Sequence, residues 1–262
     1  MTGKVYIVGA GPGDPDLITI KGLKAIESAD VILYDRLINE QLLTYAPAHA
    51  KHLYCGKAPS HHVMPQEEVN HLLVTLAQKG YTVTRLKGGD PLVFGRGGEE
   101  AQVLNDHHIP FEIVPGITSG IAAPAYAGIP VTHRDYSSSV TFVTAVTQKG
   151  VNTAEYWQHL AQGSDTLCIY MGVKKLPDIC ALLLRHGKSA DTPVALVHHG
   201  TTEQQLTEVG TLSTIVERAA HINNPSMIIV GEVVRLREEL SWFKEISAPT
   251  SVNHSKTSIH FI

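Results

Sequence analysis

Short apolar runs alternate along the chain with longer segments in which apolar residues recur at helical spacing. This alternation is typical of α/β folds, in which helices cover the faces of a sheet. The runs fall into two sets. Strands are expected in the first set at residues 5–8, 31–34, 51–54, 82–86 and 111–114, and in the second at 140–146, 166–170, 194–197, 205–209 and 227–230. We therefore expect two unlike α/β domains with a ligand cleft between them.

Helices are predicted between the strands of the first set. Asp16 is expected to cap a helix with apolar residues at positions 17, 20, 23 and 26, and residues 66–78 form a second amphipathic segment. Residues 115–130 are rich in small side chains. That composition suits a tightly packed helix at a domain junction.

We place the domain boundary near Pro115. This choice gives an N-terminal domain of residues 1–115, a C-terminal domain of residues 116–243 and a tail of residues 244–262. The tail is polar and contains a proline, so we expect it to be mobile.

The 262 residues are 43% hydrophobic, which is ample for a buried core in two domains of moderate size. Cys55, Cys168 and Cys180 are odd in number, widely spaced and without a CxxC pair, which indicates neither a disulfide framework nor a zinc site. A reducing, cytoplasmic location is expected. The sequence shows no amino-terminal signal and no apolar run long enough to span a bilayer, so no membrane association is expected.

The formal net charge of −4 argues against nonspecific nucleic-acid binding, because such binding draws on a surplus of basic residues. A polyanionic small molecule needs only a local basic cluster. Five cations fall in loops predicted to follow strands and could form one: Arg36, Lys57, Lys87, Arg96 and Arg134.

The segment RLKGGDPLVFGRGGEE, residues 85–100, is predicted to be a loop at the carboxyl end of a strand, which is where open α/β sheets bind ligands. Gly88 and Gly89 allow a ligand to approach the main chain closely. Asp90 can accept hydrogen bonds from hydroxyl or amino groups, and a carboxylate between a glycine and a proline has few structural functions. The alternative is an ordinary glycine turn.

GAGPGD, residues 9–14, follows the first predicted strand and resembles a dinucleotide-binding loop. The third glycine of that pattern is replaced by Asp14, which would repel a pyrophosphate, and Pro12 removes a backbone donor. A ligand without phosphates is therefore favoured, and a tight strand-to-helix turn is the alternative.

Both loops belong to a longer series of motifs, which includes YDRL from Tyr34, PQEEVN from Pro65, PGITS from Pro115, PVTHRDY from Pro130 and HGTTEQQ from His199. In this series the chain resembles the tetrapyrrole methyltransferases that use S-adenosylmethionine, and most closely the uroporphyrinogen-III C-methyltransferases. The resemblance covers nearly the whole chain. Several motifs in the expected order are more specific than any single glycine loop.

The resemblance implies the tetrapyrrole methylase fold and methylation of uroporphyrinogen III at C2 and C7. The implied product is precorrin-2, for siroheme, cobalamin or haem d1 synthesis. S-adenosylmethionine is the implied co-substrate, S-adenosylhomocysteine is its product, and a homodimer is the implied assembly.

The resemblance also implies the site residues. The donor site would be formed by Pro12, Gly88, Gly89, Asp90, Val93, Thr118, Ser119, Met171, Gly200, Thr201 and Ser226. The assignment of Ser226 is weaker, because the family usually has alanine there. Met171 could instead fill a core, and Thr118 and Ser119 could simply cap a helix.

Asp35 matches the family position proposed as proton acceptor, and Lys57 matches that of the proton donor. Arg96 and Glu99 match positions implicated near the macrocycle. Because a guanidinium stays protonated, carboxylate binding is favoured for Arg96, and a proton-shuttling role stays open. The implied substrate-binding residues are Arg96, Arg134, Tyr170 and Met171. For each charged residue alone, a solvated surface or a salt bridge is the alternative.

Other functions stay open on the sequence. The first is a methyltransferase of the same fold acting on a later precorrin, a ribosomal RNA ribose or a modified histidine. The second is a noncatalytic sensor that binds S-adenosylhomocysteine. No metal site is expected, because neighbours such as His198 and His199 point to opposite faces of a strand, although a chelatase is a related possibility.

Overall fold

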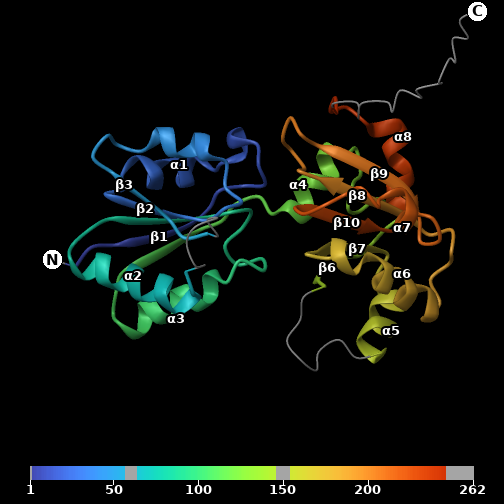
Figure 1. Cartoon of the computed structure of the whole chain (residues 1–262), viewed down its shortest axis with the longest axis horizontal. Helices are drawn as coiled ribbons and strands as arrows, with labels where there is room; N and C mark the ends of the chain where they lie inside the picture. Colours follow the sequence, from blue (N-terminus) through green and yellow to red (C-terminus); the bar gives the residue numbers. More distant parts are fainter. Residues whose placement is uncertain (1, 57–63, 146–153, 246–262) are drawn as a thin grey trace, which may run out of the picture.

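The computed structural model describes residues 2–56, 64–145 and 154–245. Each half of the chain forms a five-stranded sheet, and the segment between the two sheets leads directly into a helix (Figure 1). The expectation of two unlike α/β sheets is therefore confirmed. The predicted boundary at Pro115 falls between the last strand of the first sheet and this helix.

The first half contains β1 (Val5–Gly9), η1 (Pro15–Leu17), α1 (Ile20–Glu27), β2 (Val31–Tyr34), η2 (Glu40–Tyr45), β3 (Lys51–Tyr54), α2 (Gln66–Gln78), β4 (Val83–Lys87), α3 (Gly97–Asp106) and β5 (Phe111–Val114), where η denotes a 3-10 helix. The second half contains α4 (Ser119–Tyr126), β6 (Val140–Thr144), α5 (Ala154–Gly163), β7 (Thr166–Tyr170), η3 (Val173–Lys175), α6 (Leu176–Arg185), β8 (Pro193–His198), β9 (Leu206–Thr211), α7 (Ile215–Arg218), β10 (Ser226–Val230), η4 (Glu232–Leu236) and α8 (Arg237–Leu240). All ten predicted strands are found, within two residues of their expected bounds.

The first sheet is parallel throughout, with strand order β3-β2-β4-β1-β5. The neighbours β1 and β4 send their following connections in opposite directions, so α1 and η2 cover one face while α2 and α3 cover the other (Figure 1). A crevice forms outside the carboxyl ends of two such strands. The fold therefore predicts a ligand site where β1 and β4 end.

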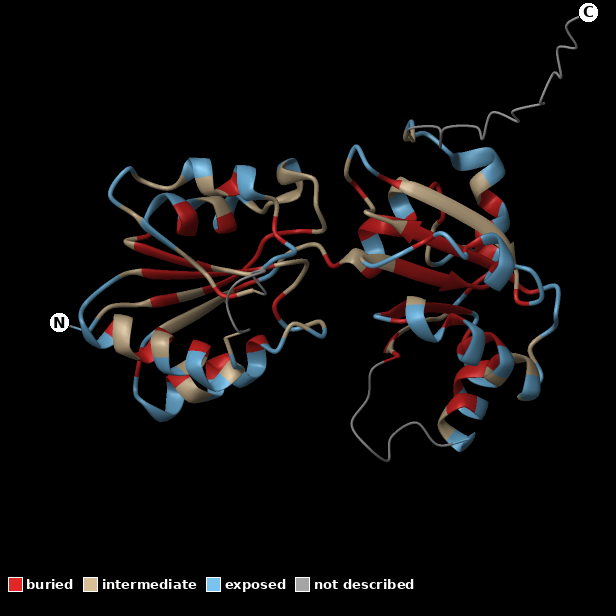
Figure 2. Cartoon of the chain, in the orientation of Figure 1, coloured by how far each residue is buried: buried red, intermediate tan, exposed pale blue. Residues whose placement is uncertain are grey.

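Helices cover both faces of this sheet, which explains why β1 and β2 in it are buried, continuous apolar runs in the sequence (Figure 2). Successive residues of β1 alternate between the two faces, because the side-chain period of a strand is two. Ile7 packs toward α2 and α3, whereas Val8 packs toward α1. Each such fully buried side chain contributes about 1.5–3 kcal/mol to stability.

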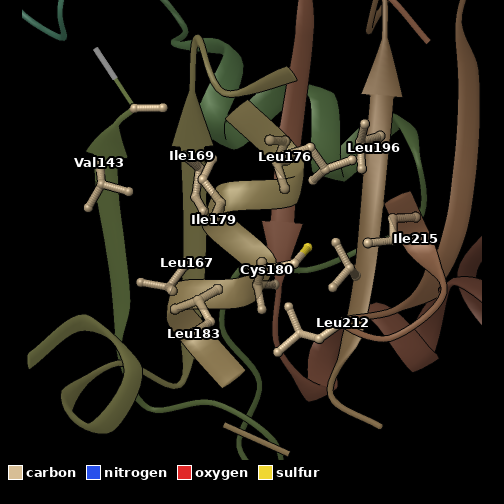
Figure 3. Packing of buried hydrophobic residues seen from close by; sticks show 14 of the residues in the cluster. Val143, Leu167, Ile169, Leu176, Ile179, Cys180, Leu183, Leu196, Leu212 and Ile215 are labelled. Carbon is tan, nitrogen blue, oxygen red and sulfur yellow. The ribbon is translucent and has the colours of Figure 1, made fainter. Parts of the chain in front are cut away.

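The second sheet is mixed, with order β6-β7-β10-β8-β9, in which only β6 and β7 are parallel. Helices α5, α6 and α7 cover one face, where Ile179 and Leu183 of α6 pack against Leu167 and Ile169 of β7 (Figure 3). Helix α4 and η4 cover the other face. The small-residue stretch predicted to form a junction helix is thus α4.

The expected cap of the first helix was wrong. Helix α1 begins after Thr19, whose hydroxyl accepts a hydrogen bond from Gly22 N at 3.0 Å. Asp16 lies instead in η1, which Asp14 caps by accepting from Asp16 N at 2.9 Å. Ile20, expected on the apolar face of this helix, is 75% exposed, and the buried residues of α1 are Gly22, Ala25 and Ile26.

Glu245, in the segment expected to be a mobile tail from residue 244, is bonded to the second half of the molecule. Glu245 accepts hydrogen bonds from the Thr207 hydroxyl at 2.6 Å and Gln205 Nε2 at 3.0 Å, and its carboxylate pairs with Arg237 at 3.1 Å. The rest of the expected tail lies outside the described residues. Among the helices of residues 2–56, 64–145 and 154–245, none combines the length and apolar character that crossing a membrane requires.

The loop after β1 joins the two halves of the molecule. Asp14 N donates to the Thr201 hydroxyl at 3.0 Å, and the Tyr126 hydroxyl donates to the Asp14 carboxylate at 2.7 Å. Burial and this hydrogen bond raise the pKa of Tyr126 to about 12. The aspartate that breaks the dinucleotide-binding pattern therefore has a structural function at the junction.

Three glycines allow the loops after β1, β4 and β5 to meet. A methyl group on Gly9 would lie 2.6 Å from Gly116 Cα and 2.6 Å from the carbonyl oxygen of Gly89. Backbone atoms cannot move aside as a flexible side chain can. No residue larger than glycine therefore fits at Gly9 or Gly116 without displacing a neighbouring loop.

Gly116→Ala is expected to lower the free energy of unfolding by about 1–3 kcal/mol, because the added methyl group overpacks the loop junction. Gly98→Ala is the matched control, since a Cβ on Gly98 in α3 meets nothing within 4 Å, and it should gain up to about 1 kcal/mol. Urea titration measures both. Equal midpoints for the two variants would contradict the steric argument.

Tyr126→Phe is expected to cost about 1 kcal/mol at neutral pH, because it removes the hydrogen bond to Asp14. The folded-state pKa of Tyr126 lies above the unfolded value of about 10, so its stabilisation is fully present below pH 10 and is lost as the pH rises toward about 12. Unfolding midpoints of wild type and variant should converge over that interval. A constant difference from pH 8 to pH 12 would refute this.

Candidate active site at the carboxyl ends of the parallel strands

Three adjacent strands, β2, β4 and β1, deliver the predicted site loops to one edge of the sheet. Gly11 and Gly89 exchange backbone hydrogen bonds of 3.2 and 2.7 Å, which tie the loop after β1 to the loop after β4. A Cβ on Gly88 would lie 3.1 Å from the Cβ of Leu37, so the loop after β2 also contacts Gly88. Asp35, which follows β2, therefore lies beside the predicted donor loop.

Asp90 makes two structural hydrogen bonds, although the sequence predicted few structural functions for it. Oδ1 of Asp90 accepts from Leu92 N at 2.8 Å, and Oδ2 accepts from Gly116 N at 3.1 Å. These bonds shape its own loop and attach it to the loop after β5. An ionised carboxylate has about four lone-pair sites, so about two stay available for a ligand. Asp90 as a donor-site residue stays a prediction.

Tyr170, at the end of β7, fixes the start of α4. Its hydroxyl pairs with the Thr118 hydroxyl at 2.7 Å and accepts from Gly120 N at 2.9 Å. Thr118 is the N-cap residue of α4 but makes no side-chain capping bond, and Ser119 is the first helical residue. Burial raises the pKa of Tyr170, so it acts here as a neutral phenol.

The loop after β4 reaches across to the second half of the molecule. Val93 packs against the core beneath α4, and the ring of Phe94 lies 4.8 Å from that of Tyr170. Phe94 and Met171 both have left-handed φ angles, of 54° and 55°, and are 42% and 49% exposed. This exposure excludes Met171 as a core residue. Strained, exposed apolar residues beside a glycine loop are typical of ligand-contacting positions.

Phe94 and Leu92 were missed by the sequence reasoning. Leu92 is 56% exposed and Phe94 follows it two residues later. The available signal was an apolar stretch, PLVF, placed between glycines in a predicted loop. Together with Met171 these residues offer apolar surface next to the site.

The arrangement of His198 and His199 at the end of β8 contradicts the expectation that the two side chains point to opposite faces of a strand. The strand ends at His198, and His199 has a φ of 43°, so the two rings turn toward each other with centroids 4.3 Å apart. Burial and the charges of His198 and Arg36 lower the pKa of His199. His198 Nδ1 lies 3.0 Å from the Ser226 hydroxyl, which places Ser226 beside this pair. The described part of the chain holds no group of three possible metal ligands.

Gly200 and Thr201 follow this pair and face the loop after β1. A Cβ on Gly13 would lie 3.0 Å from the Thr201 hydroxyl and 3.2 Å from the Gly200 carbonyl oxygen. Thr201 is 4% exposed, and its N–H donates to Gln205 Oε1 at 2.8 Å. Pro12, in the same loop as Gly13, is therefore near Gly200. Of the predicted donor residues, the structure groups those of the loops after β1, β4 and β8.

The predicted cations that the structure describes do not form one basic cluster. Lys87 is only 3% exposed and pairs with Glu100 at 2.8 Å, so it cannot bind a surface anion. Burial lowers the pKa of Lys87. Arg96 lies at the surface and pairs with Glu99 at 2.6 Å, and that hydrogen bond raises the pKa of Arg96 and lowers that of Glu99. Lys57 lies outside the described residues.

Arg134 lies in a turn at the opposite end of β7 from Tyr170. The turn is attached to the start of β7, where the Ser137 hydroxyl pairs with that of Thr166 at 2.7 Å. Thr166 and Tyr170 are four residues apart, or about 13 Å along a strand. Within one chain, the structure therefore does not bring Arg134 to Tyr170.

A family model described as Tetrapyrrole (Corrin/Porphyrin) Methylases matches residues 4–216. A uroporphyrinogen-III C-methyltransferase of Priestia megaterium is 63% identical over 234 residues, which cover 88% of this chain and 98% of that protein. Its counterpart in Bacillus subtilis (strain 168) is 58% identical over 244 residues, which cover 92% of this chain and 95% of that protein. The fold also matches a crystal structure of uroporphyrin-III C-methyl transferase from Thermus thermophilus complexed with S-adenyl homocysteine. The two chains are 38% identical with a TM-score of 0.78, and the match covers 89% of this chain and 100% of that one. The chain belongs to the tetrapyrrole methylase family.

Proposed function

We propose that this protein transfers methyl groups from S-adenosylmethionine to C2 and C7 of uroporphyrinogen III and so forms precorrin-2. The observation that carries the proposal is the 63% identity to a uroporphyrinogen-III C-methyltransferase over 98% of that protein's length. The product would serve siroheme, cobalamin or haem d1 synthesis. The protein would act as a homodimer in the cytoplasm.

The crevice between β1 and β4 suits a methyl donor without phosphates. Gly88 and Gly89 in the loop after β4 are half-buried and carry no side chain, so a donor could approach their main-chain groups closely. Asp90 keeps lone pairs for the ribose hydroxyls or the amino group of the donor. The related Thermus thermophilus structure, which is complexed with S-adenyl homocysteine, supports this class of ligand.

In the transfer, the bond between sulfur and the methyl carbon breaks as a macrocycle carbon attacks that methyl group. S-adenosylhomocysteine leaves, and the macrocycle takes up the positive charge. Loss of a proton from the ring to Asp35 then restores its conjugation. Alignment of the two reactants can lower the barrier by roughly 7–11 kcal/mol, and a general base adds about 10²–10⁴ in rate.

The acceptor would lie over the apolar residues Leu92, Phe94 and Met171, beside the surface pair Arg96–Glu99. An apolar floor suits the face of a tetrapyrrole, while its eight carboxylates need cations at the periphery. Arg96 is the cation nearest this floor in sequence. It would exchange its bond with Glu99 for one with a substrate carboxylate.

Purified protein incubated with uroporphyrinogen III and S-adenosylmethionine should give a product heavier by two methyl groups, detected by mass spectrometry. Asp35→Asn is expected to lower kcat by about 10²–10⁴, because an amide cannot accept the proton. Asp106→Asn, at an exposed position at the end of α3, is the matched control and should keep wild-type kcat.

Calorimetric titration with S-adenosylhomocysteine, combined with the methylation assay, separates the proposed enzyme from a noncatalytic sensor and from a methyltransferase for a different acceptor. Donor binding without methylation of any tetrapyrrole would favour the sensor, and methylation of a later precorrin alone would favour a different acceptor. An unchanged macrocycle beside an active control enzyme contradicts the proposed function.

A further inference from the structure

Four charged groups meet at the carboxyl end of β4, and three of them are buried. Arg85 and Lys87 of β4 are 2% and 3% exposed, and Glu100 of α3 is fully buried. The fourth, Asp35, has a side chain that is 34% exposed at the site edge. Arg85 and Lys87 are two residues apart on a strand and therefore share one face of the sheet.

Stability does not explain this cluster. Removing charges from water costs several kcal/mol for each ion, and apolar residues of similar volume are often as stable or more so. The position on the face is also unusual, because the preceding residue of that face, Val83, belongs to the hydrophobic core. Buried charged groups beside a candidate active site are candidates for a functional role.

The two carboxylate oxygens of Asp35 have different surroundings. Oδ1 accepts a hydrogen bond from Arg85 Nη2 at 2.6 Å. Oδ2 faces Lys87 Nζ at 3.9 Å, which is beyond hydrogen-bond distance. Arg85 thus orients the carboxylate, while Oδ2 accepts no hydrogen bond from the residues that the structure describes and still experiences the positive charge of Lys87.

Glu100 accounts for the distance between Lys87 and Asp35. Its Oε1 accepts from Lys87 Nζ at 2.8 Å, from Arg85 Nε at 3.1 Å and from Gln66 Nε2 at 3.0 Å. Its Oε2 is buried and has no hydrogen-bond partner among the described residues. The ammonium of Lys87 therefore binds the carboxylate on α3 in preference to the one at the site.

We propose that Glu100 is a positioning residue that holds Lys87 away from Asp35, so that Oδ2 of Asp35 stays free to accept the proton from the methylated macrocycle. The inference rests on the proposed function, in which Asp35 is the base. In that step the ring C–H bond breaks, its electron pair returns to the macrocycle, and an O–H bond forms at Oδ2. Arg85 keeps its bond to Oδ1 throughout.

The test compares Glu100→Gln with the double variant Lys87→Met/Glu100→Gln. In Glu100→Gln, Lys87 loses its anionic partner and should move onto Oδ2, so kcat is expected to fall at least about tenfold with little change in KM. In the double variant no lysine can occupy Oδ2, and kcat should recover at least about threefold over Glu100→Gln. Glu68→Gln, an exposed charge on α2, is the matched control.

A purely structural role for Glu100 predicts the opposite order, because a second change in the same buried cluster would lower kcat further. Wild-type kcat in Glu100→Gln, or a double variant no faster than Glu100→Gln, overturns the inference. If Glu100→Gln does not fold, the double variant decides alone. The double variant removes one positive and one negative charge, so Arg85 and Asp35 still balance each other. A kcat of the double variant reduced by more than about tenfold from wild type counts against the proposal.

A crystal structure of Glu100→Gln gives a readout that does not depend on activity. Lys87 Nζ is expected within about 3 Å of Asp35 Oδ2. A lysine that keeps its wild-type position overturns the inference even if the variant is slow. Failure of the proposed function is distinguishable, since it would appear as wild-type protein that does not methylate uroporphyrinogen III.

Discussion

The close approach of three loops at one edge of the parallel sheet governs the arrangement of the candidate site. Gly9, Gly89 and Gly116 bring the ends of β1, β4 and β5 within backbone contact, and Asp90 bonds its own loop to Gly116. The backbone of the neighbouring loops leaves no room for a side chain at Gly9 or Gly116. The reversal of strand order between β1 and β4 puts the crevice at the same place.

The second half of the molecule completes the site through contacts with these loops. Tyr170 holds the start of α4 through Thr118 and Gly120, and Phe94 packs on the Tyr170 ring. Asp14 connects the loop after β1 to Tyr126 on α4. A donor in the crevice and an acceptor over the apolar residues around Phe94 would then be neighbours, which is what direct methyl transfer requires.

Much of the fold could be predicted from the sequence, because strands buried on both faces appear as continuous apolar runs. The glycine loops were also predictable, since residues 9–14 and 85–100 combine turn residues with a strand in front of them. What failed were inferences that assumed continuing regular structure. His199 leaves the strand geometry that was used to separate it from His198, and Asp16, expected to cap the first α-helix, lies in a 3-10 turn before that helix.

Distances between segments far apart in the chain were the least predictable feature. Glu100 appears in sequence as part of an exposed acidic helix start, yet it is buried against Arg85 and Lys87. Two cations with i, i+2 spacing in a strand with both faces covered were the available signal, because they require a buried anion. Nothing local in the sequence indicated that Arg134 lies at the far end of β7 from Tyr170.

A crystal structure of this protein with S-adenosylhomocysteine tests the location of the site most directly. The ligand should occupy the crevice between the loops after β1 and β4, with a hydroxyl or amino group in hydrogen-bond distance of Asp90 and its sulfur directed toward Met171. A ligand bound elsewhere, with Gly88, Gly89 and Asp90 still open to solvent, would contradict the site described above.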